Sequence, residues 1–189
     1  MLEKQKLDRA QAWSLVIEHV KSDSLRKHML AVETCMRAYA RARGADIERW
    51  GTTGLLHDFD WEIHPTAAEH PELGCQMLEE LGWPPDIVRA IRGHATYLNV
   101  PRDTEMAKAL FACDELAGLI TAVAYVRPSK TVREVTVHSV LKIMKDKRFA
   151  ANVDRTDIVK AAEEFGVGLD EHIAFMINAM SENAAALGL

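Results

Sequence analysis

The residues with the clearest chemical potential are an adjacent histidine and aspartate, His57 and Asp58, which follow Leu55 and Leu56. An imidazole nitrogen beside a carboxylate oxygen suits a divalent ion, because zinc, manganese, iron and related metals accept nitrogen and oxygen donors. A His-Asp pair alone is common, and it becomes informative only when further ligands accompany it. The other histidines and aspartates therefore decide whether this doublet belongs to a metal site.

Further candidate ligands stand on both sides of the doublet, at positions that a helical pattern turns inward or places at a helix end. His28 aligns with Val32 and Tyr39 on an apolar stripe. Asp114 shares an apolar helix face with Leu110, where a carboxylate is costly unless a cation compensates it. The full set of additional candidates is His28, His70, His94 and Asp114.

Each candidate also has an explanation without a metal. The doublet can cap a helix C-terminus. His28 and Asp114 can be a core histidine and a buried ion pair with an arginine. His70 and His94 can be an N-cap and a surface helix end, and His64 is a spare candidate near the doublet. One such coincidence is easily explained, whereas six in a fixed order favour a metal site.

The elements that must position these ligands are helices. Apolar residues recur at helical spacing through most of the chain, and no strand-like alternation, repeat or linker interrupts them. Ser24 is the expected N-cap of the helix that carries His28. We expect one all-α domain over residues 1–189, with a ligand core at 24–126 and a helical extension at 127–189. The expected helices cover residues 7–20, 24–44, 46–56, 70–82, 84–94, 104–126 and 137–145. A further helix is expected to start at Thr156 or Asp157 and reach Phe165, and after a break at Gly166 and Gly168 the last helix carries an apolar stripe from Ile173 to Leu187.

Composition limits the function classes. The chain has 189 residues, is 48% hydrophobic and carries a net charge of −5, which fits a globular protein and argues against a general nucleic-acid binder. No apolar stretch is long enough to span a membrane, and the charged first residues do not resemble a signal peptide. Three separated cysteines, Cys35, Cys75 and Cys113, suggest reduced, buried thiols. We therefore expect a cytoplasmic protein.

Three stretches around the candidate ligands carry a family resemblance. They are His70-Pro71-Glu72-Leu73-Gly74, Ala90-Ile91-Arg92-Gly93-His94 and Ala112-Cys113-Asp114-Glu115-Leu116. Together with the doublet they resemble the HD superfamily of metal-dependent phosphohydrolases, over roughly half of the chain. The resemblance is greatest to its two-metal members, which include HD-type diadenosine tetraphosphate hydrolases and HD-GYP-like phosphodiesterases.

The resemblance implies an all-α HD-domain bundle and a ligand set. By that resemblance one metal is held by His28, His57, Asp58 and Asp114, and Asp58 bridges to a second metal held by His70 and His94. The chain departs from many members after the doublet, where Phe59-Asp60-Trp61-Glu62 contains no lysine. It also lacks the Gly-Tyr-Pro signature of cyclic-di-GMP enzymes.

The resulting functional expectation is hydrolysis of a small phosphate monoester or diester, such as a nucleotide, with one or two divalent ions per chain. Manganese, iron, cobalt, zinc, nickel and magnesium all remain open as the metal. Asp58, Asp60 and Glu62 are the candidate catalytic residues, the latter two as general base or as residues that orient water.

Cationic residues should neutralise the phosphate, since phosphoryl transfer depends on positioning and charge compensation. The candidates for substrate binding are Arg92, Arg127 and Lys130, although the last two need the tail to fold back over the site. A solvated helix C-terminus explains them equally well.

Two other functions fit the same ligands: a di-iron oxygenase of HD fold, and a non-catalytic regulatory module that binds metal. The tail can also make a homodimer contact.

Overall fold

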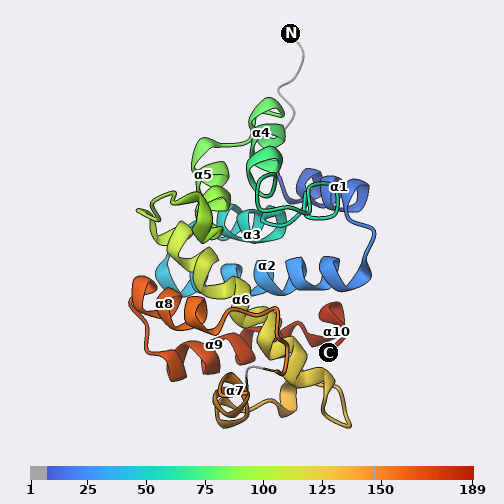
Figure 1. Ribbon diagram of the computed structural model, residues 1–189, viewed down its shortest axis with the longest axis vertical. Helices are drawn as coiled ribbons and strands as arrows, with labels where there is room; N and C mark the ends of the chain where they lie inside the picture. The colour runs from blue at the N-terminus through green and yellow to red at the C-terminus, as the bar shows by residue number, and fades with distance from the viewer. Residues whose placement is uncertain (1–7, 147) are drawn as a thin grey trace.

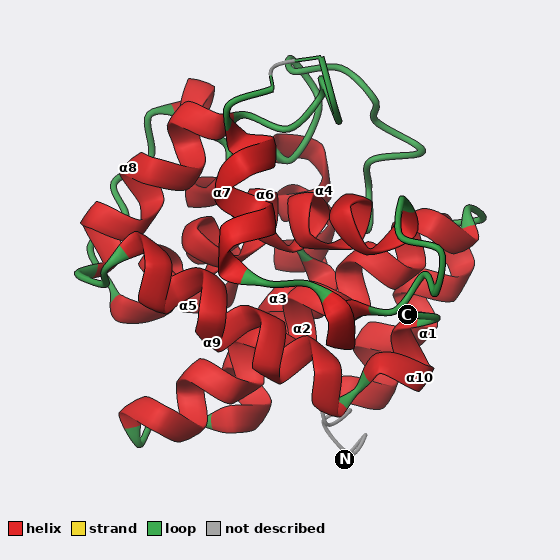
Figure 2. Ribbon diagram, turned by 90° about the horizontal axis from the view of Figure 1, so that it is seen from below, coloured by secondary structure: helices red, strands yellow, loops and turns green. Residues whose placement is uncertain are grey.

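The computed structural model describes residues 8–146 and 148–189. These residues form ten α-helices and two 3-10 turns, and they contain no strand (Figures 1 and 2). The fold is therefore all-α, as the helical periodicity predicted. The elements are α1 (Arg9–His19), α2 (Asp23–Arg43), α3 (Ile47–Leu56), α4 (Glu72–Glu80), α5 (Pro85–His94), η1 (Thr96–Leu98), α6 (Glu105–Tyr125), η2 (Val132–Glu134), α7 (Val137–Met144), α8 (Arg155–Phe165), α9 (Leu169–Glu182) and α10 (Ala184–Leu187).

Helix α6 crosses the centre of the molecule and contacts both halves of the chain. It packs against α2, α3 and α5, and also against α7, α8 and α9 of the extension (Figure 1). The helix carries apolar side chains on nearly all of its faces, so most of its residues are buried, among them Leu110, Leu116 and Ile120. A helix buried in this way can present Asp114 to the interior.

Two glycines bring α3 close to α2. A β-carbon at Gly54 would lie 3.0 Å from the backbone nitrogen of Glu33 and 3.0 Å from Met36 Cγ. A β-carbon at Gly51 would lie 2.5 Å from Arg37 Nε. The missing side chains therefore permit a close helix pair, and that pair brings His28 on α2 near the C-terminal end of α3.

The helix boundaries follow the predictions with small corrections. The N-cap of helix α2 lies two residues earlier than expected, because Ser22 and not Ser24 accepts from the Leu25 N–H. The last predicted helix is interrupted at Asn183 and continues as α10. Gly44 ends α2 in the left-handed conformation, with φ of 66°, as its position after the apolar stripe suggested.

The extension folds back onto the ligand core. Helix α8 packs on α6, and α9 contacts both α2 and α6. A single domain over residues 1–189 stays a prediction, and residues 1–7 and 147 within it lie outside the described residues. All three cysteines are buried and unpaired. None of the described helices is long and apolar enough to cross a membrane.

His172 on α9 joins the extension to the core. Its Nδ1 accepts from the Tyr39 hydroxyl at 2.6 Å, and its Nε2–H donates to the Ala112 carbonyl at 2.8 Å. Burial lowers the pKa of this histidine from its usual 6.5, although the bond to Ala112 opposes the shift. The folded state therefore holds the ring neutral.

We expect the substitution His172→Leu to lower the free energy of unfolding by about 2 kcal/mol, because it leaves the buried Tyr39 hydroxyl without its acceptor. Since the folded pKa lies below the unfolded value, the contribution of His172 is complete above about pH 6.5 and declines as the pH falls further. Urea titrations of both proteins above and below that pH measure the difference. A difference that stayed constant or widened in acid would contradict this assignment.

Candidate metal centre

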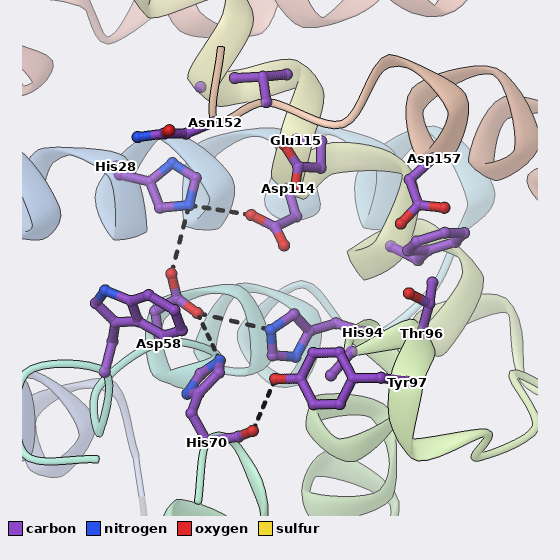
Figure 3. Close-up of a pocket in the computed structure, with 15 residues that line it drawn as sticks. His28, Asp58, His70, His94, Thr96, Tyr97, Asp114, Glu115, Asn152 and Asp157 are labelled. Atoms are coloured by element: carbon purple, nitrogen blue, oxygen red, sulfur yellow. Dashed lines mark hydrogen bonds and ion pairs between the residues drawn. The ribbon is translucent and has the colours of Figure 1, made fainter. Parts of the chain in front are cut away.

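Four helices, or their ends, and the segment before a fifth helix bring the six predicted ligands to one place. His28 comes from α2, His57 and Asp58 from the end of α3, and His94 from the last residue of α5. His70 precedes α4, and Asp114 lies on α6. Figure 3 shows Asp58 between His28 on one side and His70 and His94 on the other. Residues separated by up to 86 positions in the chain thus share one site.

His28, His57 and Asp114 form a first group whose potential ligand atoms all lie within 4.8 Å of one another. His28 Nε2 is 3.0 Å from Asp114 Oδ1 and 3.3 Å from His57 Nε2. His57 Nε2 is 3.3 Å from the same aspartate oxygen. Two nitrogens and one oxygen therefore converge on a common point.

Asp58, His70 and His94 form a second group of the same kind. Asp58 Oδ1 is 3.4 Å from His70 Nε2 and 3.6 Å from His94 Nε2. Its other oxygen, Oδ2, faces the first group, at 3.4 Å from His57 Nε2 and 3.8 Å from His28 Nε2. One carboxylate thus connects the two groups.

The backs of three histidine rings are fixed by acceptors. His57 Nδ1 lies 2.8 Å from the Gly54 carbonyl, and His94 Nδ1 lies 2.6 Å from the Ile91 carbonyl. His70 Nδ1 lies 2.9 Å from Asp60 Oδ1. Each acceptor favours a proton on Nδ1 and leaves the Nε2 lone pair directed inward, which is the arrangement that metal-bound histidines require. The donor set and its supporting bonds therefore fit divalent metal ions.

The centre attracts positive charge. Burial opposes ionisation at Asp58 and Asp114, but the facing histidines hold the pKa values of both carboxyls well below their usual range. Burial likewise disfavours a charged His70, yet Asp58 and Asp60 raise its pKa to about 9. Two partly buried carboxylates thus favour cations beside them, and a metal ion can take that place in competition with protons.

Asp60, predicted as a catalytic residue, lies behind His70. It is 1% exposed, and its second oxygen accepts from the Gly74 N–H at 3.2 Å. It is absent from the residues that line the cavity at the centre. The structure therefore places Asp60 where it orients His70, away from the space open to substrate.

Glu62, the other predicted general base, faces away from the ligands. Its carboxylate accepts from the backbone N–H groups of Lys21 at 2.6 Å and Ser22 at 2.9 Å. These bonds attach the turn after the doublet to the segment that starts α2, the helix of His28. Glu62 does not line the cavity either.

The three predicted substrate-binding cations also lie outside the cavity lining. Arg92 pairs with Glu72 at 2.8 Å and with Glu79 at 2.7 Å. Arg127 follows the end of α6 and is partly buried, and Lys130 is exposed in the turn beyond it. The tail does fold back over the site, as substrate binding by Arg127 and Lys130 would require. However, the part of the tail that reaches the cavity is α8 and the loop before it, not Arg127 or Lys130.

A cavity of about 370 Å³ opens over the centre. Besides five of the ligands, its lining contains aromatic, polar and small apolar residues that were not predicted as site residues from the sequence. Several of them, Trp61 and Glu115 among them, lie within three residues of a predicted ligand and could have been suspected from that position. Asn152, Val153 and Asp157 carry no such local signal. These further lining residues are Trp61, Ala95, Thr96, Tyr97, Phe111, Glu115, Gly118, Asn152, Val153 and Asp157.

Two carboxyl groups of this lining are electrostatically crowded. Burial and the neighbouring Asp114 raise the pKa of Glu115 to about 8. Burial and Asp154 raise the pKa of Asp157. Among the described residues, the lining contains no lysine or arginine.

The fold and this centre agree with the comparison to known families. The profile of the HD domain matches residues 25–119, which include all six ligands. The chain belongs to the HD domain family, within the superfamily of metal-dependent phosphohydrolases, and HD domains bind divalent metals. The resemblance recognised in the sequence is confirmed.

The curated relatives carry the name Ribonuclease Y. Those from Oleidesulfovibrio alaskensis and from Nitratidesulfovibrio vulgaris strains DP4 and Hildenborough are each 29% identical to this chain over 98 residues. The matched segment is 51% of this chain but only 18% of each relative. No solved structure matches the chain significantly.

Proposed function

We propose that this protein is a metal-dependent phosphohydrolase that holds two divalent ions and cleaves a small phosphate ester. The observation that carries the proposal is the position of Asp58, whose two oxygens face different ligand groups. A carboxylate shared in this way is suited to fix two ions at the short separation that two-metal hydrolases use. Family membership supports the same chemistry, and so does the relatives' name, which denotes an enzyme that cleaves phosphodiesters.

His28, His57 and Asp114 would hold one ion, and His70 and His94 the other, with Asp58 between them. When bound, such ions supply positive charge for the phosphate oxygens and lower the pKa of a coordinated water. The protein's own contribution is to fix the ligands: the Gly54 and Ile91 carbonyls and Asp60 hold three rings in one orientation.

The lining supports the proposal of two ions. Phosphate carries charge that must be compensated in the transition state, and in the described lining no cationic side chain is available for this. For substrate binding by Arg92, Arg127 or Lys130, these side chains would have to move toward the cavity. We therefore assign the compensation to the two ions.

The proposal is tested by metal analysis and turnover of the full chain, purified without chelator or affinity-column metal. We expect two equivalents of a divalent transition metal per chain and hydrolysis of p-nitrophenyl phosphate. Chelation should abolish the hydrolysis, and metal addition should restore it. One equivalent would restrict binding to one ligand group, and no metal after addition of manganese or iron would overturn the proposal. Iron together with oxygen consumption, without ester hydrolysis, would identify the di-iron oxygenase instead.

A further inference from the structure

One wall of the cavity is acidic beyond the ligand set. Glu115 follows Asp114 on α6, and Asp157 lies in the first turn of α8. Thr96 and Asn152 lie in the same part of the lining. We name these four residues, Thr96, Glu115, Asn152 and Asp157, the acidic wall. Figure 3 shows Asp157 and Thr96 on the side of the cavity opposite His28.

The carboxylates of the acidic wall have hydrogen-bond donors but no cation in the lining. Glu115 Oε2 accepts from the Asp154 N–H at 3.1 Å, and Asp157 interacts with the Thr96 side chain. The nearby Arg102 is committed elsewhere, to Glu164 at 2.7 Å and to the Gly93 carbonyl at 2.7 Å. The wall therefore presents carboxyl oxygens, which accept hydrogen bonds from N–H donors, to whatever occupies the cavity.

Two half-exposed aromatic side chains form the rim. Trp61 is 43% exposed and makes a perpendicular, edge-to-face contact with His70, with ring centroids 4.8 Å apart. Tyr97 is 47% exposed and donates its hydroxyl to the His70 carbonyl at 2.7 Å. Both contacts hold the rings beside the metal centre. Aromatic faces combined with carboxylates are a recurrent way to bind organic cations.

We propose that the substrate is a small phosphate ester whose organic part carries an ammonium group. This inference rests on the proposed function: the phosphate lies at the six-ligand centre, and the ammonium lies between the acidic wall and the aromatic rim. The cavity of about 370 Å³ is near the lower end of the range for ligand sites, which favours a compact ester. An ester with an additional anionic group would place that group, and no N–H donor, beside these carboxyl groups, which disfavours its binding.

The test compares two esters on the metal-loaded full chain. Phosphoethanolamine and propyl phosphate have similar length, but one ends in an ammonium and the other in a methyl group. We expect kcat/KM to favour phosphoethanolamine by about tenfold, the ratio that one interaction of about 1.4 kcal/mol produces. The substitutions Glu115→Gln and Asp157→Asn should each move the ratio toward one.

A matched control lies on the same helix as Asp157. Glu163 is exposed on α8 and does not line the cavity, so Glu163→Gln should keep the wild-type ratio. Metal content and thermal unfolding of every variant show whether the fold and centre are intact. The wild-type comparison tests the inference even if a variant fails to fold.

The outcomes separate the inference from the proposed function. If propyl phosphate is hydrolysed as efficiently as phosphoethanolamine, the ammonium preference is overturned and the hydrolase remains. If neither ester is hydrolysed but calorimetry shows tighter binding of phosphoethanolamine, the acidic wall is supported and the hydrolase is overturned. Equal binding without turnover would contradict both.

Discussion

The substitution Asp58→Asn is expected to remove at least one metal equivalent and to lower kcat/KM by more than about 100-fold. Loss of a residue that only supports a metal ligand typically costs about 10–100-fold in affinity or activity. Asp58 faces both ligand groups directly, with Oδ1 3.4 Å from His70 Nε2 and Oδ2 3.4 Å from His57 Nε2. The loss of Asp58 should therefore cost more in metal affinity and activity than the loss of such a supporting residue.

The reason is chemical rather than steric. Asparagine has nearly the same shape as aspartate, but an NH₂ group replaces one of the two carboxylate oxygens. This group donates hydrogen bonds and has no lone pair with which to bind a metal. The amide also removes a negative charge from a centre in which Asp58 helps to hold the pKa values of His57 and His70 above their ordinary range. The variant therefore loses both a ligand atom and part of the field that attracts cations.

Metal analysis and turnover of p-nitrophenyl phosphate measure this effect, and circular dichroism verifies the helical fold. Asp170→Asn is the matched control, because Asp170 is an exposed aspartate in the first turn of α9 and does not line the cavity. It should retain two equivalents and full turnover. An Asp58→Asn protein with wild-type metal content and rate would show that the six residues are not a metal centre.

The helices and the ligand set were accessible from the sequence for a physical reason. Helical period and capping residues are local, so α6 was predicted as residues 104–126 and runs from Glu105 to Tyr125. The ligands are rare residue types in apolar settings, which makes His28 and Asp114 visible as anomalies on their helices. The structure brings these residues together, and metal binding by them remains to be tested.

The surroundings of the ligands were not accessible in the same way. Asp60 faces His70 and not water because its carboxylate bonds to the His70 ring, which links the turn after α3 to the segment before α4. The local sequence does not encode this contact. The contribution of Asp157 depends on α8 packing against α6, which no local pattern encodes. Arg92 was selected for its charge, but Glu72 and Glu79 on the facing helix already bind it. Pairing between distant segments thus decides which polar residues remain available for substrate.

The position of Asp60 gives the glycine in His70-Pro71-Glu72-Leu73-Gly74 a specific role. A β-carbon at Gly74 would lie 2.3 Å from Asp60 Cγ and 2.6 Å from Oδ2. The carboxylate is 1% exposed and accepts from the Gly74 N–H, so it cannot remain in place beside an alanine. The glycine therefore provides the space in which Asp60 holds His70.

We expect Gly74→Ala to weaken binding of the metal at His70 by about 10–100-fold, the usual cost of losing a group that orients a metal-bound histidine. The metal held by His28, His57 and Asp114 should bind more nearly as in the wild type, because Asp60 contacts none of these residues in the described hydrogen bonds. Overpacking should also destabilise the fold by about 1–3 kcal/mol, partly offset by the better helix propensity of alanine.

Calorimetric metal titration separates the two binding events, and two further variants assign the cause. Asp60→Asn keeps the volume but removes the charge and one of the two acceptor oxygens that bind His70 and the Gly74 N–H, so it should show the same selective loss without the overpacking. Gly118→Ala on α6 makes the same substitution where the nearest atom, Val153 Cγ2, is 4.0 Å away. It should bind two equivalents and unfold no more easily than the wild type. If Gly74→Ala and Asp60→Asn both bound two equivalents with unchanged affinity, the orientation of His70 by Asp60 would have no part in metal binding.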